Sequence, residues 1–146
     1  MGLIYAEQVE HMSLDQMQET HESEIKILNE IDSLAVDYEI HKAKPDELEK
    51  KLNEYIAHVK EHFASEERLM EKYDFPNYEM HKMAHDMFLA DLEYSTVSWK
   101  QRGDLKKIIN FVRKTPEWIV MHVNSVDAPT ADYLAVKIHE EEQAKN

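Results

Sequence analysis

Four long segments of this chain carry stripes of mostly apolar residues spaced alternately three and four positions apart. In chain order the stripes are Leu14, Met17, His21, Glu24, Leu28, Ile31 and Ala35; Leu48, Leu52, Tyr55, Val59, His62, Glu66, Leu69 and Tyr73; Tyr78, His81, His85, Phe88, Leu92, Ser95 and Trp99; and Leu105, Ile108, Val112, Thr115, Ile119, His122 and Val126. Such spacing is typical of the inner seam of helices packed nearly antiparallel. We therefore expect an all-α, up-down-up-down four-helix bundle.

Local signals place the helix ends. Pro45 and Pro76 stand where the second and third helices would begin, and Gly103 is a suitable C-cap for the third. We expect helices near 14–41, 46–73, 77–101 and 104–126, then a short helix or tail over 131–146, in one domain spanning 1–146. Pro116 lies inside the fourth stripe, so that helix should kink or restart there.

The composition limits the classes of function. A net charge of −13 argues against binding to nucleic acid or to an anionic membrane surface, because both need clustered lysine and arginine. No apolar run approaches about 18 residues, so we expect no membrane-spanning helix. The absence of cysteine excludes disulfides, zinc–thiolate sites and iron–sulfur clusters, and it leaves the cytoplasm as the default location.

Polar residues interrupt all four stripes at a similar depth. They are His21 and Glu24, His62 and Glu66, His81 and His85, and His122. One histidine on an apolar face is usually a core residue satisfied by a hydrogen bond, but that explanation fails for the set. Seven unpaired buried polar groups would each cost about 1–3 kcal/mol, and the sum would exceed the roughly 5–15 kcal/mol that stabilises a typical domain.

Metal ions would remove this cost, because they use the lone pairs of the polar groups. Imidazole and carboxylate ligands without thiolate suit iron, manganese or zinc. So many ligands exceed what one ion can use, and the sequence therefore predicts two ions.

Asp127 completes the set on a different argument. It follows His122 by five residues, which corresponds to about 140° around an ideal α-helix. It can reach the site only if the backbone leaves α-geometry between the two residues. Ala128 and Pro129 just beyond are consistent with a helix that ends there.

With these residues in place, the chain closely resembles the hemerythrin family, and specifically its bacterial single-domain members. The resemblance covers roughly residues 14–133. The matching pieces are His21, the HFASEE stretch with His62 and Glu66, the HKMAH stretch with His81 and His85, and WIVMHVNSVD with Trp118, His122 and Asp127.

The resemblance implies a role for each matching residue. One iron would be saturated by His81, His85 and His122, and the other would be held by His21 and His62 with one position open to oxygen. Glu66 and Asp127 would bridge the two irons together with an oxo or hydroxo oxygen. The family's apolar oxygen pocket matches Phe63, Trp118, Ile119 and Val123.

Three positions depart from the family pattern: Glu24, His58 and Pro116, the last of which perturbs the helix that carries His122. Glu24 stands where relatives usually have leucine over the open iron. It either turns to solvent or pairs with a basic side chain, or it reaches the pocket as an extra ligand or an acid–base group. His58 stands where relatives commonly have tyrosine, and we expect it to support the site or to lie at the surface. His11, His41 and His139 lie off the stripes and are expected to be solvated.

Three functions fit this pattern. The first is reversible binding of molecular oxygen for storage, delivery or sensing, with Glu24 modifying the open iron position. The second is a diiron enzyme acting on oxygen or peroxide, for which Glu24 would supply proton transfer. The third is a regulatory or iron-sensing module, although nothing in the sequence indicates a protein partner.

Overall fold

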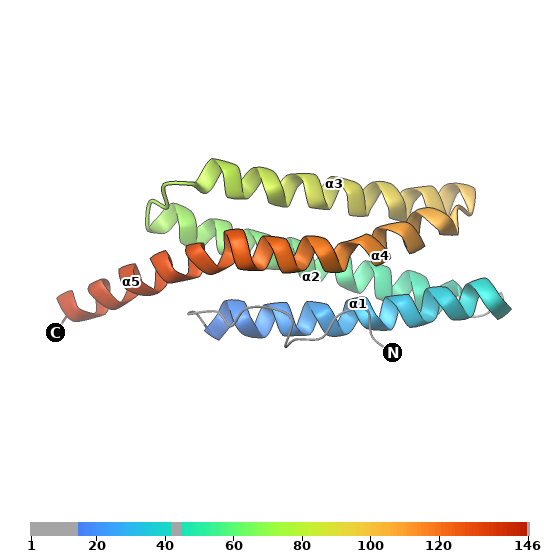
Figure 1. The fold of residues 1–146 in the computed structure, drawn as a ribbon, viewed down its shortest axis with the longest axis horizontal. Coiled ribbons are helices and arrows are strands. Elements are labelled where there is room, and N and C mark those ends of the chain that lie inside the picture. Colours follow the sequence, from blue (N-terminus) through green and yellow to red (C-terminus); the bar gives the residue numbers. More distant parts are fainter. Residues whose placement is uncertain (1–14, 42–44, 146) are drawn as a thin grey trace.

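The computed structural model describes residues 15–41 and 45–145, and over these ranges the chain is an all-α four-helix bundle (Figure 1). Its elements are α1 (Asp15–His41), α2 (Pro45–Lys72), α3 (Tyr78–Arg102), α4 (Leu105–His122), the π-helical turn η2 (Val123–Asp127) and α5 (Ala128–Ala144). Consecutive helices of the bundle run antiparallel. No strand occurs among the described residues.

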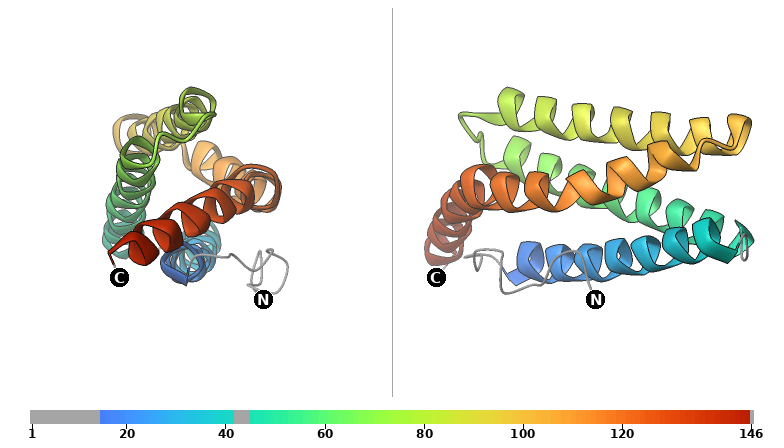
Figure 2. Two further views of the ribbon diagram at one scale, coloured as in Figure 1. Left: turned by 90° about the vertical axis from the view of Figure 1, so that its left-hand side faces the viewer. Right: turned by 45° about the vertical axis from the view of Figure 1, so that its right-hand side comes forward.

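The four helices pack in a ring around one core. Both α1 and α3 lie beside α2 and α4, as the end-on view in Figure 2 shows. The core contains the apolar members of the predicted stripes, such as Leu28, Leu52, Leu92 and Val112, all nearly inaccessible to solvent. Leu14 of the first stripe lies outside the described residues, and so does the side chain of Met17.

Tight turns allow the antiparallel packing. Gly103 ends α3 in the left-handed conformation, with φ of 69°, and its N–H donates to the carbonyl of Trp99. After α2, Asp74 also has a positive φ, and the N–H of Phe75 donates to the carbonyl of Met70 five residues earlier. This six-to-one hydrogen bond is the Schellman ending of a helix.

The fourth helix does not end near residue 126, which corrects the expected bounds. It continues through η2 into α5, and α5 extends beyond the end of the bundle (Figure 1). Pro129 stands in the first turn of α5, where a missing N–H is tolerated. The expected short helix or tail over 131–146 is thus the main part of a helix that begins at Ala128.

The turn η2 also changes which residues face inward. An α-helical spacing of four from His122 predicts Val126 on the inner face, but Val126 is only half-buried. Asp127, at a spacing of five, is 1% exposed instead. The N–H of Ala128 donates to the carbonyl of Val123 five residues earlier, so the backbone leaves α-geometry at this point, as the argument for Asp127 required.

The fourth helix does not restart at Pro116, although a restart was one of the two effects expected of this proline. Helix α4 runs through Pro116 as one element. Close to the proline, the hydroxyl of Thr115 donates to the carbonyl of Phe111 at 2.6 Å.

None of the helices in the described part of the chain has the length and apolar character needed to cross a bilayer. A cytoplasmic location and a single domain over the whole of 1–146 stay predictions from the sequence.

Candidate metal centre

All four bundle helices and η2 direct polar side chains to one section of the core. His21 comes from α1, His62 and Glu66 from α2, His81 and His85 from α3, His122 from α4 and Asp127 from η2. Each of the seven residues is at most 7% exposed. The residues form two groups, and within each group one nitrogen or oxygen atom from every residue lies within 4.8 Å of those of the others.

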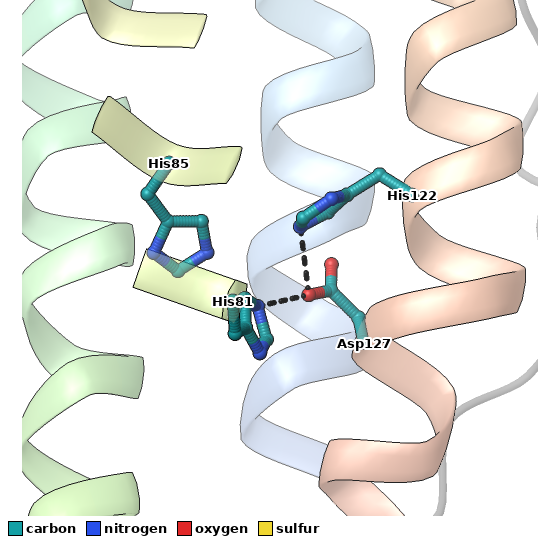
Figure 3. A group of neighbouring side chains, drawn as sticks. All are labelled: His81, His85, His122 and Asp127. Carbon is teal, nitrogen blue, oxygen red and sulfur yellow. Dashed lines mark ion pairs between the residues drawn. The ribbon is translucent and has the colours of Figure 1, made fainter. Parts of the chain in front are cut away.

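The three-histidine group consists of His81, His85, His122 and Asp127 (Figure 3). Oδ1 of Asp127 lies 2.9 Å from Nε2 of His81 and 3.1 Å from Nε2 of His122. The three imidazoles surround one small volume with their Nε2 atoms toward the carboxylates. Such a convergence of imidazoles is a common metal-binding arrangement.

The two-histidine group consists of His21, His62, Glu66 and again Asp127. Oδ2 of Asp127 lies 3.0 Å from Nε2 of His21, while Oε2 of Glu66 pairs with Nε2 of His62. This group therefore has one imidazole fewer than the other.

Both carboxylates extend between the two groups. Asp127 directs Oδ1 to the three-histidine group and Oδ2 to His21. Glu66 directs Oε2 to His62, and its Oε1 lies 3.2 Å from Nε2 of His85 and 3.4 Å from Nε2 of His81. Each carboxylate thus offers one oxygen to each group, as a bridge between two cations requires.

Hydrogen bonds on the far side of two imidazoles fix their tautomers. The hydroxyl of Thr130 donates to the carbonyl of Val126, so its oxygen accepts from Nδ1 of His81 at 3.0 Å. Nδ1 of His85 donates to Oε2 of Glu67 at 3.1 Å. When these rings are neutral, the lone pair is therefore on Nε2, directed into the site.

Sequence reasoning did not name Glu67 or Thr130. Glu67 follows Glu66 directly, and Thr130 follows Asp127 by three residues. Their closeness to candidate ligands was the available signal, but periodicity alone does not show which ring nitrogen a neighbour reaches.

The charges of the site favour a cation between the carboxylates. Burial acts to raise the pKa of Asp127, but its contacts with His122, His21 and His81 outweigh this effect and hold the pKa well below its usual range. Burial likewise acts to lower the pKa of His81, but contacts with Asp127 and Glu66 raise that pKa to about 9. Buried carboxylates of this kind need positive charge on the imidazoles or between them.

The unpaired polar atoms of the core also fit a metal centre. Among the described residues, buried side-chain nitrogen or oxygen atoms without a hydrogen bond belong only to the seven residues and to the neighbouring Glu24 and His58. They include Nε2 of His21, His81, His85 and His122. These are the atoms on which a metal ion would act, so the side chains present fit a pair of ions.

Glu24 is buried, as its place on the first stripe predicted, but it lies in neither group. Its Oε2 contacts Nδ1 of His62, on the opposite side of the ring from Glu66, and lies 3.4 Å from Nδ1 of His58. Glu24 therefore does not turn to solvent, whereas its expected role as an extra ligand or an acid–base group stays a prediction from the sequence. His58 is about one-third exposed and supports the site through Glu24.

Two of the four residues expected to line an oxygen pocket, Phe63 and Trp118, stack on candidate ligands, and the pocket role of all four stays a prediction from the sequence. Phe63 stacks on His85, with ring centroids 3.8 Å apart, and Trp118 stacks on His122 at 4.3 Å. Phe63 also contacts the ring of His62. Ile119 and Val123 are buried on the same stretch of α4 and η2. His139 lies on α5 away from both groups, whereas His11 and the side chain of His41 lie outside the described residues.

The fold and the site define a class: an antiparallel four-helix bundle whose core holds histidine and carboxylate groups able to bind two metal ions. Comparison with known proteins narrows this class. The Hemerythrin HHE cation binding domain matches residues 12–128. The chain therefore belongs to the hemerythrin family, whose cofactor is a pair of iron ions.

Two curated relatives agree with this assignment. A bacteriohemerythrin from Aquifex aeolicus is 29% identical over 119 residues, which is 81% of this chain and 87% of that protein. A bacteriohemerythrin from Ralstonia nicotianae is 36% identical over 84 residues, which is 58% of this chain and 61% of that protein. No solved structure gave a significant match.

Proposed function

We propose that this protein binds molecular oxygen reversibly at a diiron centre, for storage, delivery or sensing. The observation that carries the proposal is the pair of ligand groups that share Asp127 in the core of a hemerythrin-family bundle. The names of the two bacteriohemerythrins support the same function.

The proposed ligands divide unequally between the irons. His81, His85 and His122 would hold one iron, and His21 and His62 the other. Glu66 and Asp127 would bridge the pair, since each offers one oxygen to each group. An oxo or hydroxo oxygen from solvent would complete the bridge. The iron with one imidazole fewer would keep a position for oxygen, and the redox chemistry of the pair supplies the electrons that oxygen binding needs.

The chain's own residues would keep this region dry and ordered. Phe63, Ile119 and Val123 are buried, and Trp118 covers His122 with its ring. Apolar walls of this kind exclude water and protons, which protects a reversible complex from side reactions. Thr130 and Glu67 hold the rings of His81 and His85 in the tautomer that leaves Nε2 free.

The alternative function, a diiron enzyme acting on oxygen or peroxide, depended on Glu24 as an acid–base group beside the open position. The contacts of Glu24 with Nδ1 of His62 and with His58 support a role behind a candidate ligand more than an acid–base role at the open position. Reversible oxygen binding is therefore the better-supported function.

An oxygen titration of the reduced, iron-loaded protein tests the proposal. We expect a visible absorption band that appears with oxygen, disappears when oxygen is removed, and returns over several cycles. His122→Ala is the control, because it removes a proposed ligand and should remove the band. Rapid oxidation of wild type without a reversible band, together with turnover of peroxide, would favour the enzyme instead.

A further inference from the structure

His62 is held between two carboxylates that come from different helices. Its Nε2 faces Glu66 on the same helix, α2, and its Nδ1 contacts Glu24 on α1. All three side chains are at most 10% exposed. With a metal on Nε2, a neutral imidazole must carry its proton on Nδ1, and Oε2 of Glu24 is the atom that faces this position.

The other imidazole of the two-histidine group has no comparable support. Nδ1 of His21 is buried, and it has neither a hydrogen bond to any described residue nor a carboxylate contact like the one between Nδ1 of His62 and Glu24. In the three-histidine group, by contrast, Thr130 supports His81 and Glu67 supports His85. In the two-histidine group, Glu24 is therefore the residue that supports an imidazole at its outer nitrogen, Nδ1.

His58 restricts where the carboxylate of Glu24 can lie. It stands one helical turn before His62 on α2, and its Nδ1 lies 3.4 Å from the same Oε2. One oxygen of Glu24 is thus shared by two imidazoles of the facing helix. This double contact holds the carboxylate on the Nδ1 side of His62, opposite the Nε2 that faces Glu66.

We propose that Glu24 is a positioning residue for His62, which orients this ligand and increases its electron donation to the iron of the two-histidine group. The inference rests on the proposed function and extends it to a residue outside the ligand set. A carboxylate that accepts from the outer nitrogen of a ligating histidine fixes the ring and raises its basicity. A more basic ligand stabilises the more oxidised metal, so Glu24 lowers the reduction potential of the pair and favours loss of electrons to oxygen.

Two variants separate charge from orientation. Glu24→Gln keeps the shape of the side chain and an oxygen acceptor but removes the charge. Glu24→Leu removes the oxygen acceptor as well as the charge. Glu30→Gln is the matched control, since Glu30 also joins α1 to α2, through Lys51 at 2.6 Å, but contacts no histidine of the site. For each protein we would measure iron per chain, the midpoint potential by spectroelectrochemistry, and the rate of iron release to a chelator.

The proposal predicts a different result for each variant. Glu24→Gln should keep two irons and shift the potential upward, and a tenfold loss of preference for the oxidised state corresponds to about 59 mV for one electron. Glu24→Leu should bind one of its two irons roughly 10- to 100-fold more weakly, as expected when such support is lost, and should release it faster to the chelator. Glu30→Gln should match wild type in all three measurements.

Two results would overturn the inference. The first is a midpoint potential in Glu24→Gln equal to that of wild type. This measurement tests the inference even if Glu24→Leu fails to fold. The second is an equal shift in Glu30→Gln, which would show an effect of helix packing and not of His62. Failure of the proposed function looks different, because wild type itself would then hold fewer than two irons or show no reversible oxygen band.

Discussion

Oδ1 of Asp127 lies 3.1 Å from Nε2 of His122, although the two residues stand five positions apart on one continuous helix. On an α-helix this spacing would separate the side chains by about 140°. The π-helical turn η2 has more residues per turn and brings both side chains to the inner face. The candidate centre therefore depends on one additional residue in this helix.

Deletion of the exposed Ser125 tests this relationship. The deletion should convert η2 into an α-helical turn, in which Asp127 follows His122 by four positions and still faces inward. We expect two irons per chain and a melting temperature no lower than that of wild type.

The matched control is deletion of the exposed Met121, just before His122 in regular α-helix. This deletion should rotate His122 by about 100° and reduce the iron content below two. Equal iron loss in both deletions would show that the π shape itself is required.

Asp127→Ala should lose iron from both positions, because Asp127 belongs to both groups. The metal stabilises the folded state, by about 2.7 kcal/mol when free metal is 100-fold above its dissociation constant. The variant should therefore melt lower than the iron-loaded wild type and show no further change with a chelator. Asp86→Asn, which alters only an exposed pair with Lys82, is the control. Retention of one tightly bound iron in Asp127→Ala would contradict a shared carboxylate.

Metal uptake should release protons in a pH-dependent way. In the metal-free protein, burial lowers the pKa of His81, but contacts with Asp127 and Glu66 outweigh it and raise the pKa to about 9. His81 is then protonated at pH 7, and a metal must displace that proton. The apparent affinity should increase as the pH rises toward 9 and level off above it.

Calorimetry in two buffers with different ionisation enthalpies measures the protons released. We expect more protons at pH 7 than at pH 10. The same number at both values would show that His81 does not carry the displaced proton.

Trp118 should report on iron binding through its fluorescence. Its ring stacks on His122 with centroids 4.3 Å apart and an interplanar angle of 11°. Iron at His122 should quench this tryptophan, so titration of the metal-free protein should lower the emission until two irons are bound.

Trp118→Phe should remove most of this quenching and keep the iron content. Trp99→Phe is the control, because Trp99 packs against Tyr38 and not against a histidine of the site. If Trp99→Phe removed the quenching instead, Trp99 and not Trp118 would be the tryptophan that responds to iron, and the prediction would be wrong.

The sequence by itself determined the fold class and the residues that meet in the core. Each stripe is a local pattern with the period of a helix, so it shows which face of a segment must be buried wherever that segment packs. Polar members at matching depths, such as His21, His62 and His85, could then only share one interior. Six of the seven polar stripe residues, all except Glu24, are members of the two groups in the structure, together with Asp127.

Only the tertiary structure decided which inward side chains touch. The stripe gave Glu24 a direction but not a partner, because the partner depends on how far α1 is shifted along α2 and on the rotamers that packing allows. Those factors bring its carboxylate to Nδ1 of His62. They also bring Glu67 and Thr130 behind His85 and His81.

The course of the last helix was likewise beyond the sequence. Ala128 and Pro129 suggested an end, since proline usually stops a helix locally. A π turn instead absorbs one residue and keeps Asp127, Thr130 and Leu134 on the buried side. Local periodicity shows only the direction in which a side chain points around one helix axis. An extra residue in a turn disturbs the regular hydrogen bonds of the helix, so it is tolerated only when contacts with neighbouring helices compensate. Here the polar cluster of the core supplies those contacts.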